Sequence, residues 1–277
     1  MNPHRDYRDP FTGVGVRLAG DSAAATDFLI HEAGCLRYRD WNHRGIISPY
    51  WRLHYNFAPG NSVVCDGRLY RLHPRMVLLT PAGVRIDTRG PRVVLHTWIH
   101  FTPTRGYRLP LRSPVSVRIA PPQRAVLREL AADFRNDKAR AGLARLHHLS
   151  QALLHGVFAG LEPGLYRSVP AALGALLSQM EEHPEQDLSV TALARLAGKS
   201  RTQFAAWFKS AMDETPARYV QRLRVRLAAA RLGGGEGSID EIAAATGFAN
   251  RHHFTRVFAA MSGIGPGAYR RRHQRKA

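Results

Sequence analysis

The sequence predicts a two-domain α+β protein, with a β-sandwich or β-barrel in the N-terminal half and an all-helical C-terminal domain. Short stretches of alternating bulky and polar residues, separated by Pro and Gly, fill residues 1 to about 120. Apolar residues then recur every three or four positions, and no strand-like alternation appears after residue 170. These two periods are those of strands and of helices. A chain of 277 residues that is 44% hydrophobic can bury a core in each of two ordinary domains.

Three stretches of the N-terminal half have the clearest strand pattern. They are YWRLHYNF (Tyr50 to Phe57), RMVLLTPAG (Arg75 to Gly83) and RVVLHTWIHF (Arg92 to Phe101). Turn-forming pairs interrupt this half at Pro59-Gly60, Asp66-Gly67 and Gly90-Pro91. Short strands with breaks at a spacing of about 8–12 residues are typical of an antiparallel sandwich or barrel.

Two amphipathic helices follow the strands, in QRAVLRELAADF and LARLHHLSQALLHGVF. The second helix has one apolar stripe, made of Leu143, Leu146, Leu149, Leu153 and Val157. Its partner is either the sheet of the same chain or the same helix in a second copy, and the stripe is our candidate for a dimerisation segment. EPGLYRSVP, from Glu162 to Pro170, has the composition of a linker. We therefore predict domains at 1–160 and 171–277, with a linker at 161–170.

The C-terminal domain contains an internal repeat. LSVTALARLAGKSRTQFAAWF aligns with GSIDEIAAATGFANRHHFTRVF. Four residues match others 49 positions later: Val190, Leu193, Ala194 and Gly198 match Ile239, Ile242, Ala243 and Gly247. Four more match at 50 positions: Phe204, Phe208, Pro216 and Tyr219 match Phe254, Phe258, Pro266 and Tyr269. Each copy is predicted to be a helix, a turn at the glycine with positive φ, and a second helix.

Capping signals support the helix boundaries of this repeat. Ser238 and Glu241 form an S-x-x-E capping box before the second copy. A connecting helix is predicted from Thr215, which can cap it, to Leu232, with Pro216 at the first helical position. At ~1.5 Å per residue this helix is roughly 25 Å long, which suits two second helices placed about one DNA turn apart, ~34 Å.

The charge of the chain predicts binding to a polyanion. The formal net charge is +19 and the isoelectric point is about 11.1. From Leu188 onward, 16 Lys and Arg stand against 5 Asp and Glu, although only four of the 40 basic residues in the chain are lysines, so a bias towards arginine also contributes. A tandem helix-turn-helix in a basic segment predicts a second helix in the DNA major groove.

Other features narrow the class of protein. There is no run of 18 apolar residues and the N-terminus is polar, so neither a transmembrane span nor a signal peptide is predicted. Two cysteines, Cys35 and Cys65, are too few for a disulfide framework or a Cys-rich zinc site, and they fit a reducing cytoplasm. A disulfide between these two stays open.

The repeat resembles the C-terminal domain of the AraC/XylS family of bacterial transcription regulators. The resemblance covers about residues 170–272 and is carried by GFANRHHFTRVF and GIGPGAYRR: Gly247, Phe248, Phe254, Phe258, Pro266, Tyr269 and Arg270. SPYWRLHYNFAPG (Ser48 to Gly60) and the pair His100-Phe101 are similar to the family's cupin-like sensor domains. The resemblance implies a cupin-like effector-binding and dimerisation domain, a homodimer, contact with RNA polymerase, and neither enzymatic activity nor a cofactor.

The resemblance also indicates which residues bind DNA. Base contacts in the family come from outward positions that correspond to Thr202, Ala205 and Ala206 in the first copy and to His252 and Arg256 in the second. Ala205 and Ala206 offer only methyl groups, so we expect the second copy to read more bases. Arg256 is expected to pair with a guanine, and a phosphate contact stays open. The candidate DNA-binding residues are Ser200, Arg201, Thr202, Gln203, Lys209, Asn250, Arg251, His252, Thr255 and Arg256.

The candidate effector site is a set of aromatic and polar residues in the N-terminal half: Tyr38, Trp51, His54, Tyr55, Thr80, His96 and Trp98. The resemblance implies a sugar, an aromatic acid or another small metabolite as the effector. His96 and His100 are four residues apart, which on a strand is roughly 13 Å, too far for one metal ion. No metal site is predicted.

The predicted function is sequence-specific DNA binding in transcription regulation, controlled by a small-molecule effector. Three other functions fit the sequence less well. A metalloenzyme tethered to DNA needs a compact His/Glu cluster, and an alkylation-repair protein needs a Cys cluster; neither pattern is present in the sequence. A structural DNA binder without an effector does not account for more than 150 residues before the repeat. Nothing in the sequence separates an activator from a repressor.

Overall fold

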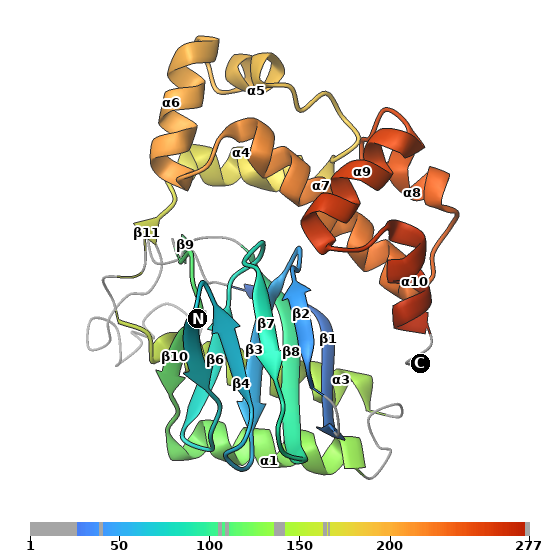
Figure 1. The fold of residues 1–277 in the computed structure, drawn as a ribbon. Helices are drawn as coiled ribbons and strands as arrows, with labels where there is room; N and C mark the ends of the chain where they lie inside the picture. Colours follow the sequence, from blue (N-terminus) through green and yellow to red (C-terminus); the bar gives the residue numbers. More distant parts are fainter. Residues whose placement is uncertain are drawn as a thin grey trace, which may run out of the picture.

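The computed structural model describes residues 27–274, except 39–40, 105–106, 109–110, 136–141, 163–164 and 166. A β domain that carries two helices lies below a helical domain (Figure 1). This confirms the two-domain α+β architecture predicted from the sequence. None of the helices in the described part is long and apolar enough to cross a membrane. Cys35 and Cys65 are both free thiols.

The β domain consists mainly of two antiparallel sheets. The larger sheet has the order β1 (Asp27–Tyr38), β8 (Val94–Thr104), β3 (Trp51–Asn56), β6 (Met76–Thr80) and β10 (Val115–Arg118). The smaller sheet has the order β2 (His43–Ile46), β7 (Ile86–Arg89), β4 (Ser62–Cys65) and β5 (Arg68–Arg71). A further short antiparallel pair joins β9 (Tyr107–Arg108) to β11 (Arg167–Ser168). Strand β11 lies within the linker predicted at residues 161–170. The three predicted strands are therefore confirmed as β3, β6 and β8.

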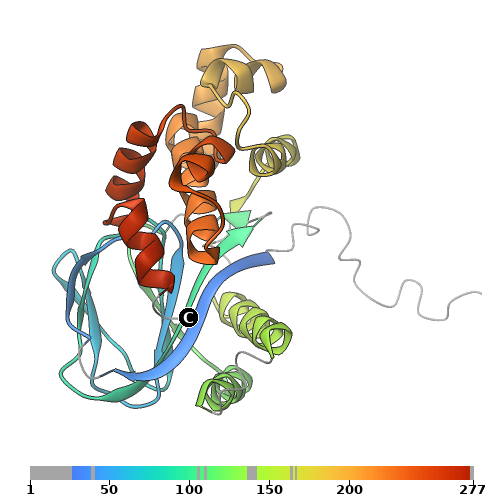
Figure 2. The ribbon, with the colours of Figure 1, turned by 90° about the vertical axis from the view of Figure 1, so that its right-hand side faces the viewer.

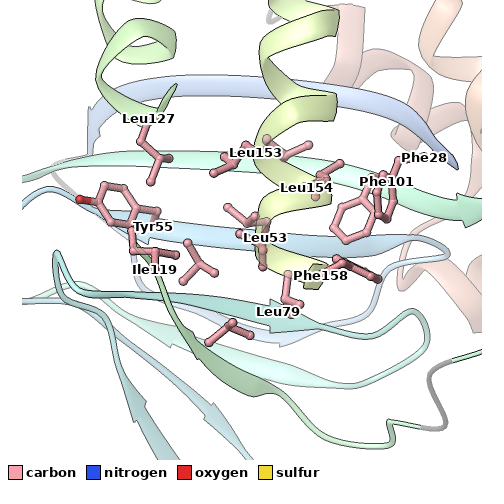
Figure 3. Packing of buried hydrophobic residues seen from close by; sticks show 14 of the residues in the cluster. Phe28, Leu53, Tyr55, Leu79, Phe101, Ile119, Leu127, Leu153, Leu154 and Phe158 are labelled. Atoms are coloured by element: carbon pink, nitrogen blue, oxygen red, sulfur yellow. The ribbon is translucent and has the colours of Figure 1, made fainter. Parts of the chain in front are cut away.

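Successive side chains of β3 point alternately to the two faces of the larger sheet. Leu53 and Tyr55 belong to the core that lies between the larger sheet and the helices (Figure 3). His54, between them in sequence, faces the other way and contacts Trp41, which packs with residues of the smaller sheet. Successive side chains of a strand point to opposite faces, so one strand supplies an apolar face to the helices and a polar face to the interior between the sheets.

Helices α1 (Pro121–Arg135) and α3 (Leu143–Ala159) lie together on one side of the strands (Figure 2). Leu146, Leu153 and Val157 of the α3 stripe are buried in the core with Leu53, whereas Leu143 is 71% exposed. The stripe thus packs on the sheet of its own chain, which was one of the two alternatives. Apart from Leu143, its residues are buried in this core or, in the case of Leu149, partly buried against it.

The helical domain contains two cores, one for each copy of the repeat. Its elements are α4 (Ala171–Glu182), α5 (Val190–Leu196), α6 (Arg201–Met212), α7 (Pro216–Gly234), α8 (Ile239–Ala245), α9 (Arg251–Ser262) and α10 (Pro266–Gln274). Phe204 and Phe208 of α6 are fully buried in the first core, and Phe254 and Phe258 of α9 are fully buried in the second. Helix α7 contributes to both cores, so it joins the two copies as predicted.

The turns and caps of the repeat are confirmed. Gly198 and Gly247 have φ values of 63° and 81°, a region that glycine enters without a Cβ penalty. A Cβ on Gly247 would also lie 2.3 Å from the carbonyl oxygen of Pro184, so no side chain fits there. The Ser238–Glu241 capping box is present, and Thr215 accepts a bond from the backbone N–H of Arg218. Helix α7 continues to Gly234, two residues beyond the predicted end.

Candidate nucleic-acid interface and β-domain interior

Helices α6 and α9 each present a polar face opposite their buried phenylalanines. The side chains of Arg201, Thr202 and Lys209 on α6 are exposed, and so are His252 and Arg256 on α9. Thr255 is half-buried, as is Ala205, while Ala206 is exposed. His252 and Arg256 are four residues apart and therefore share one face of the helix.

At the start of α6, two of the candidate DNA-binding residues serve as a cap. The hydroxyl of Ser200 accepts from the backbone N–H of Gln203 at 3.3 Å, and Gln203 Oε1 accepts from the Ser200 N–H at 3.2 Å. This is a capping box that sequence reasoning missed, although its S-x-x-Q spacing was visible. Lys199 lies over the ring of Trp207, 5.1 Å from its centroid. The side chains of Arg201, Thr202 and Lys209 take no part in this cap and are exposed, so they can contact a partner molecule.

At the start of α9, two candidate DNA-binding residues also make contacts within the protein. Asn250 caps the helix, because its Oδ1 accepts from the His253 N–H at 2.8 Å. Arg251 Nη1 donates to Asp240 Oδ2 at 2.9 Å, in a pair whose side chains are both more than half exposed. Within the described residues no hydrogen bond or ion pair holds the side chains of His252 or Arg256, so both are available to a base or a phosphate.

Three arginines of α7 are used inside the helical domain. Arg222 pairs with Glu214, and Arg226 Nη2 donates to Glu181 at 2.7 Å. Arg224 donates to the carbonyl oxygens of Pro184 and Gln186, at 3.1 and 3.0 Å. These side chains stabilise the packing of the first copy, so the basic charge counted from the sequence is larger than the charge offered to a partner.

The interior between the sheets contains a buried polar cluster. The rings of His54 and His96 are stacked, with Nδ1 of His54 3.4 Å from Nε2 of His96. Nδ1 of His96 lies 2.7 Å from Oδ1 of Asn56. Burial lowers the pKa of His96 to about 3 and the pKa of His54 well below its usual value, so both imidazoles are neutral at pH 7. His54 Nε2, Asn56 Nδ2 and Thr80 Oγ1 are buried without a hydrogen-bond partner.

This cluster unites only part of the predicted effector set. His54, Thr80, His96 and Trp98 lie on strand positions that face the interior. Trp51 instead contacts Phe101 and Phe158, and Tyr55 lies in the core beneath the helices. The side chain of Tyr38 is outside the described part of the structure. Strand parity could have separated these residues, because Trp51 and Tyr55 are odd-numbered positions of β3 and His54 is even.

The histidine pair is not accompanied by the further ligands that a metal ion needs. In the part of the chain that the structure describes, no group of three or more His, Cys, Asp and Glu side chains could hold a metal. The third polar group beside His54 and His96 is the amide of Asn56, which is a poor ligand for the metals that imidazoles bind.

The β domain contacts the second copy of the repeat through a shared aromatic residue. Tyr50, just before β3, is buried in the same core as Phe258 and Tyr269. The Tyr269 hydroxyl donates to the Tyr50 hydroxyl at 3.3 Å, and the Tyr50 ring stacks on His100 with 4.8 Å between centroids. Figure 2 shows α10, in red, reaching down beside the strands. The first copy contacts the β domain through an exposed ion pair, Arg112 with Asp213 at 2.7 Å.

Comparison with known proteins assigns the helical domain to a family. Residues 193–272 match the family described as helix-turn-helix domain. The transcriptional activator RclR of Escherichia coli is 34% identical over 100 residues, and the regulator AlkR of Acinetobacter baylyi is 33% identical over 98. An AraC-like transcription regulator of Streptomyces lividans is 32% identical over 95. The helical domain is thus similar to the helix-turn-helix domains of AraC-like transcription regulators, and we call it the AraC-type domain.

The likeness to these relatives covers only part of each chain. The matches cover 34–36% of this chain, and the chain spans about a third of the length of these relatives, 31–35%. The matched relatives are transcription regulators, and the matched part of this chain is similar to about a third of each of them.

The arrangement of a β domain before an AraC-type domain is found in a solved structure. ToxT from Vibrio cholerae superimposes with a TM-score of 0.58 over 88% of this chain and 97% of its own, at 12% identity. At that identity the comparison supports the fold alone. Another structure of ToxT contains a bound unsaturated fatty acid, with a TM-score of 0.58 and 13% identity.

Proposed function

We propose that this protein is a sequence-specific transcription regulator whose AraC-type domain is controlled by a small-molecule effector bound in the N-terminal domain. The observation that carries the proposal is the pair of helices α6 and α9, each with an exposed polar face, joined by the continuous helix α7. Two such helices on one rigid connector can enter successive turns of the major groove. The excess of positive charge in the same segment supports attraction to DNA.

The two copies divide the work in this proposal. His252 and Arg256 of the second copy read base edges, because their side chains are exposed and uncommitted. The first copy binds the DNA backbone through Arg201, Thr202 and Lys209, since Ser200 and Gln203 are engaged in capping and the alanines offer no hydrogen bonds. Asn250 and Arg251 position the start of α9. Thr255 follows Arg251 by four residues, one turn further along the same helix, and is half-buried.

The remaining features of the proposal concern the N-terminal domain. It is a cupin-like domain over residues 1–160, followed by a linker at 161–170 and the DNA-binding domain at 171–277. That ToxT has been solved with a fatty acid supports an effector for this fold, and the polar interior with His54 and His96 supports a ligand that brings polar atoms. The working form is a cytoplasmic homodimer that contacts RNA polymerase and has no enzymatic activity.

DNA selection from a random library with the full chain, at two salt concentrations, tests the function. A recurrent two-part motif that survives the higher salt is the expected result. Arg256→Ala should lose one defined base position, and Arg271→Ala, an exposed arginine on α10, should keep the motif. Motif-free binding that disappears steeply as salt rises would mean that charge acts alone through counterion release, and the proposal would then fail.

A further inference from the structure

We infer that Tyr50 of the β domain is a positioning residue for base reading by the second copy of the repeat, and that His100 and Glu32 connect it to the interior between the sheets. This rests on the proposed function and deepens it, because it names the residues through which the β domain sets the position of helix α9. The observation that carries it is an aromatic residue of one domain buried in the core of the other.

The core of the second copy is completed by the β domain. Tyr50 is 3% exposed and lies in one cluster with Phe254, Phe258 and Tyr269. It is the one buried member of that cluster, among the residues described, that comes from outside the helical domain. The buried residues of the first core, in contrast, run from Leu173 to Leu223. The packing around α9 therefore depends on a side chain that the AraC-type domain does not contain.

Tyr50 reaches the base-reading face of α9 through two further rings. The Tyr269 hydroxyl donates to the Tyr50 hydroxyl at 3.3 Å, and the Tyr269 ring packs edge-on against Phe258, with 5.2 Å between centroids. Phe258 is fully buried and follows Arg256 by two residues. Two residues are about 200° apart on a helix, so these side chains lie on opposite faces. A change in the packing of Phe258 therefore displaces the side chain of Arg256.

Two histidines of the β domain hold the Tyr50 ring from its other side. The ring stacks on His100, with 4.8 Å between centroids and 25° between planes, and its centroid is 5.2 Å from that of His31. His100 Nδ1 in turn lies 3.1 Å from Glu32 Oε2. Close packing on this side means that Tyr50 cannot shift unless His100 shifts with it.

Glu32 continues these contacts to the polar interior. Its other oxygen, Oε1, accepts from Trp98 Nε1 at 3.1 Å. The indole lies across β1 at Gly34, where a Cβ would be 2.1 Å from Cζ2 of Trp98, so a side chain there would displace it. Trp98 is also nearly parallel to His96, with 15° between planes and 6.1 Å between centroids. Packed side chains and hydrogen bonds thus run without a break from His96 to Tyr50, which is the kind of network that carries coupling.

DNA binding by the full chain tests the positioning role. Fluorescence anisotropy compares the selected duplex with a duplex whose bases under the second copy are scrambled. Tyr50→Ala should lose about 5-fold or more of the discrimination between the two duplexes, which is the range of one base contact. Its affinity for the scrambled duplex should stay within about 2-fold of the wild type, because phosphate contacts carry that affinity. Tyr50→Phe keeps the ring and should restore the discrimination.

A matched control separates positioning from loss of stability. Tyr55 is also a tyrosine of the β domain with 3% exposure, but it lies in the core beneath α1 and α3. Tyr55→Ala should therefore keep the discrimination of the wild type. If Tyr50→Ala keeps it too, or if both variants lose it alike, the positioning role is overturned.

Hydrogen exchange in the absence of DNA tests the connection to the interior. Trp98→Phe removes the indole donor to Glu32 and should raise exchange in residues 264–270 by about 5-fold, as expected for the loss of one hydrogen bond. Trp51→Phe, on a ring that contacts Phe158 instead, should leave that exchange unchanged. No difference between the two variants would overturn the connection, and this measurement also decides the case if Tyr50→Ala does not fold. A DNA selection without a motif would overturn the proposed function and leave the exchange result standing.

Discussion

The two copies of the repeat have the same order of helices, but they differ in the contacts that stabilise them and in the side chains that they expose. The first copy is stabilised by the pairs of Arg222 and Arg226 on α7, has a capping box at the start of α6, and has an exposed ion pair with Arg112 of the β domain. The second has an exposed His252–Arg256 face and a core that includes Tyr50 of the β domain. Sequence symmetry therefore does not imply equal surroundings: the copy with the exposed His252–Arg256 face is also the one whose core includes Tyr50 of the β domain.

The largest expected effect comes from emptying the aromatic cores. Phe254→Ala and Phe204→Ala each remove a fully buried ring and should lower the free energy of unfolding by about 3–5 kcal/mol, measured by urea denaturation. Only Phe254→Ala should also raise hydrogen exchange in residues 45–50, because its core includes Tyr50. Equal deprotection of that loop by Phe204→Ala would contradict the difference between the copies.

The next effect concerns ion pairs. Glu181→Ala leaves the guanidinium of Arg226, whose side chain is 6% exposed, without its partner, and should cost about 3 kcal/mol of unfolding free energy. Asp240→Ala, which breaks the exposed pair with Arg251 in the second copy, should cost at most about 1 kcal/mol. Both are measured by the same denaturation. Similar losses would show that burial does not separate the two pairs.

Base discrimination should also differ between the copies. Arg256→Ala should lose about 1–3 kcal/mol of discrimination at one base pair, whereas Lys209→Ala should weaken binding evenly across sequences and lower the salt slope by about 1. Fluorescence anisotropy on the selected site and its single-base variants measures both. A base-specific loss for Lys209→Ala would assign base reading to the first copy instead.

The smallest effect comes from the hydrogen bond between the domains. Tyr50→Phe and Tyr269→Phe each remove one hydroxyl of a buried pair and should lower the free energy of unfolding by about 1 kcal/mol. The double variant should cost less than the sum of the two, because both remove the same bond. Additive losses in that double-mutant cycle would mean that the two hydroxyls act independently.

Features that depend on neighbours in the sequence were predictable. The alternation of β3, β6 and β8, the glycine turns at Gly198 and Gly247, and the capping box at Ser238 all follow from contacts within four residues or from the two-residue period of a strand. The long edge strand β1 was not predicted, because its role as a strand depends on pairing with β8 about 65 residues away. Four of the predicted effector residues meet in the interior, and Trp51 and Tyr55 do not, since neighbouring residues of a strand face opposite sides.

By itself, the sequence determined the order of the domains, the repeat with its two recognition helices, and the residues on their outward faces. These are consequences of helical and strand periods, of turn chemistry and of charge, all of which are local. Only the tertiary structure decided that the α3 stripe packs on its own sheet, that Arg222 and Arg226 of α7 form internal ion pairs, and that Tyr50 meets Tyr269 from 219 residues away. Such contacts depend on which distant segments the fold brings together, and no spacing in the chain encodes that directly.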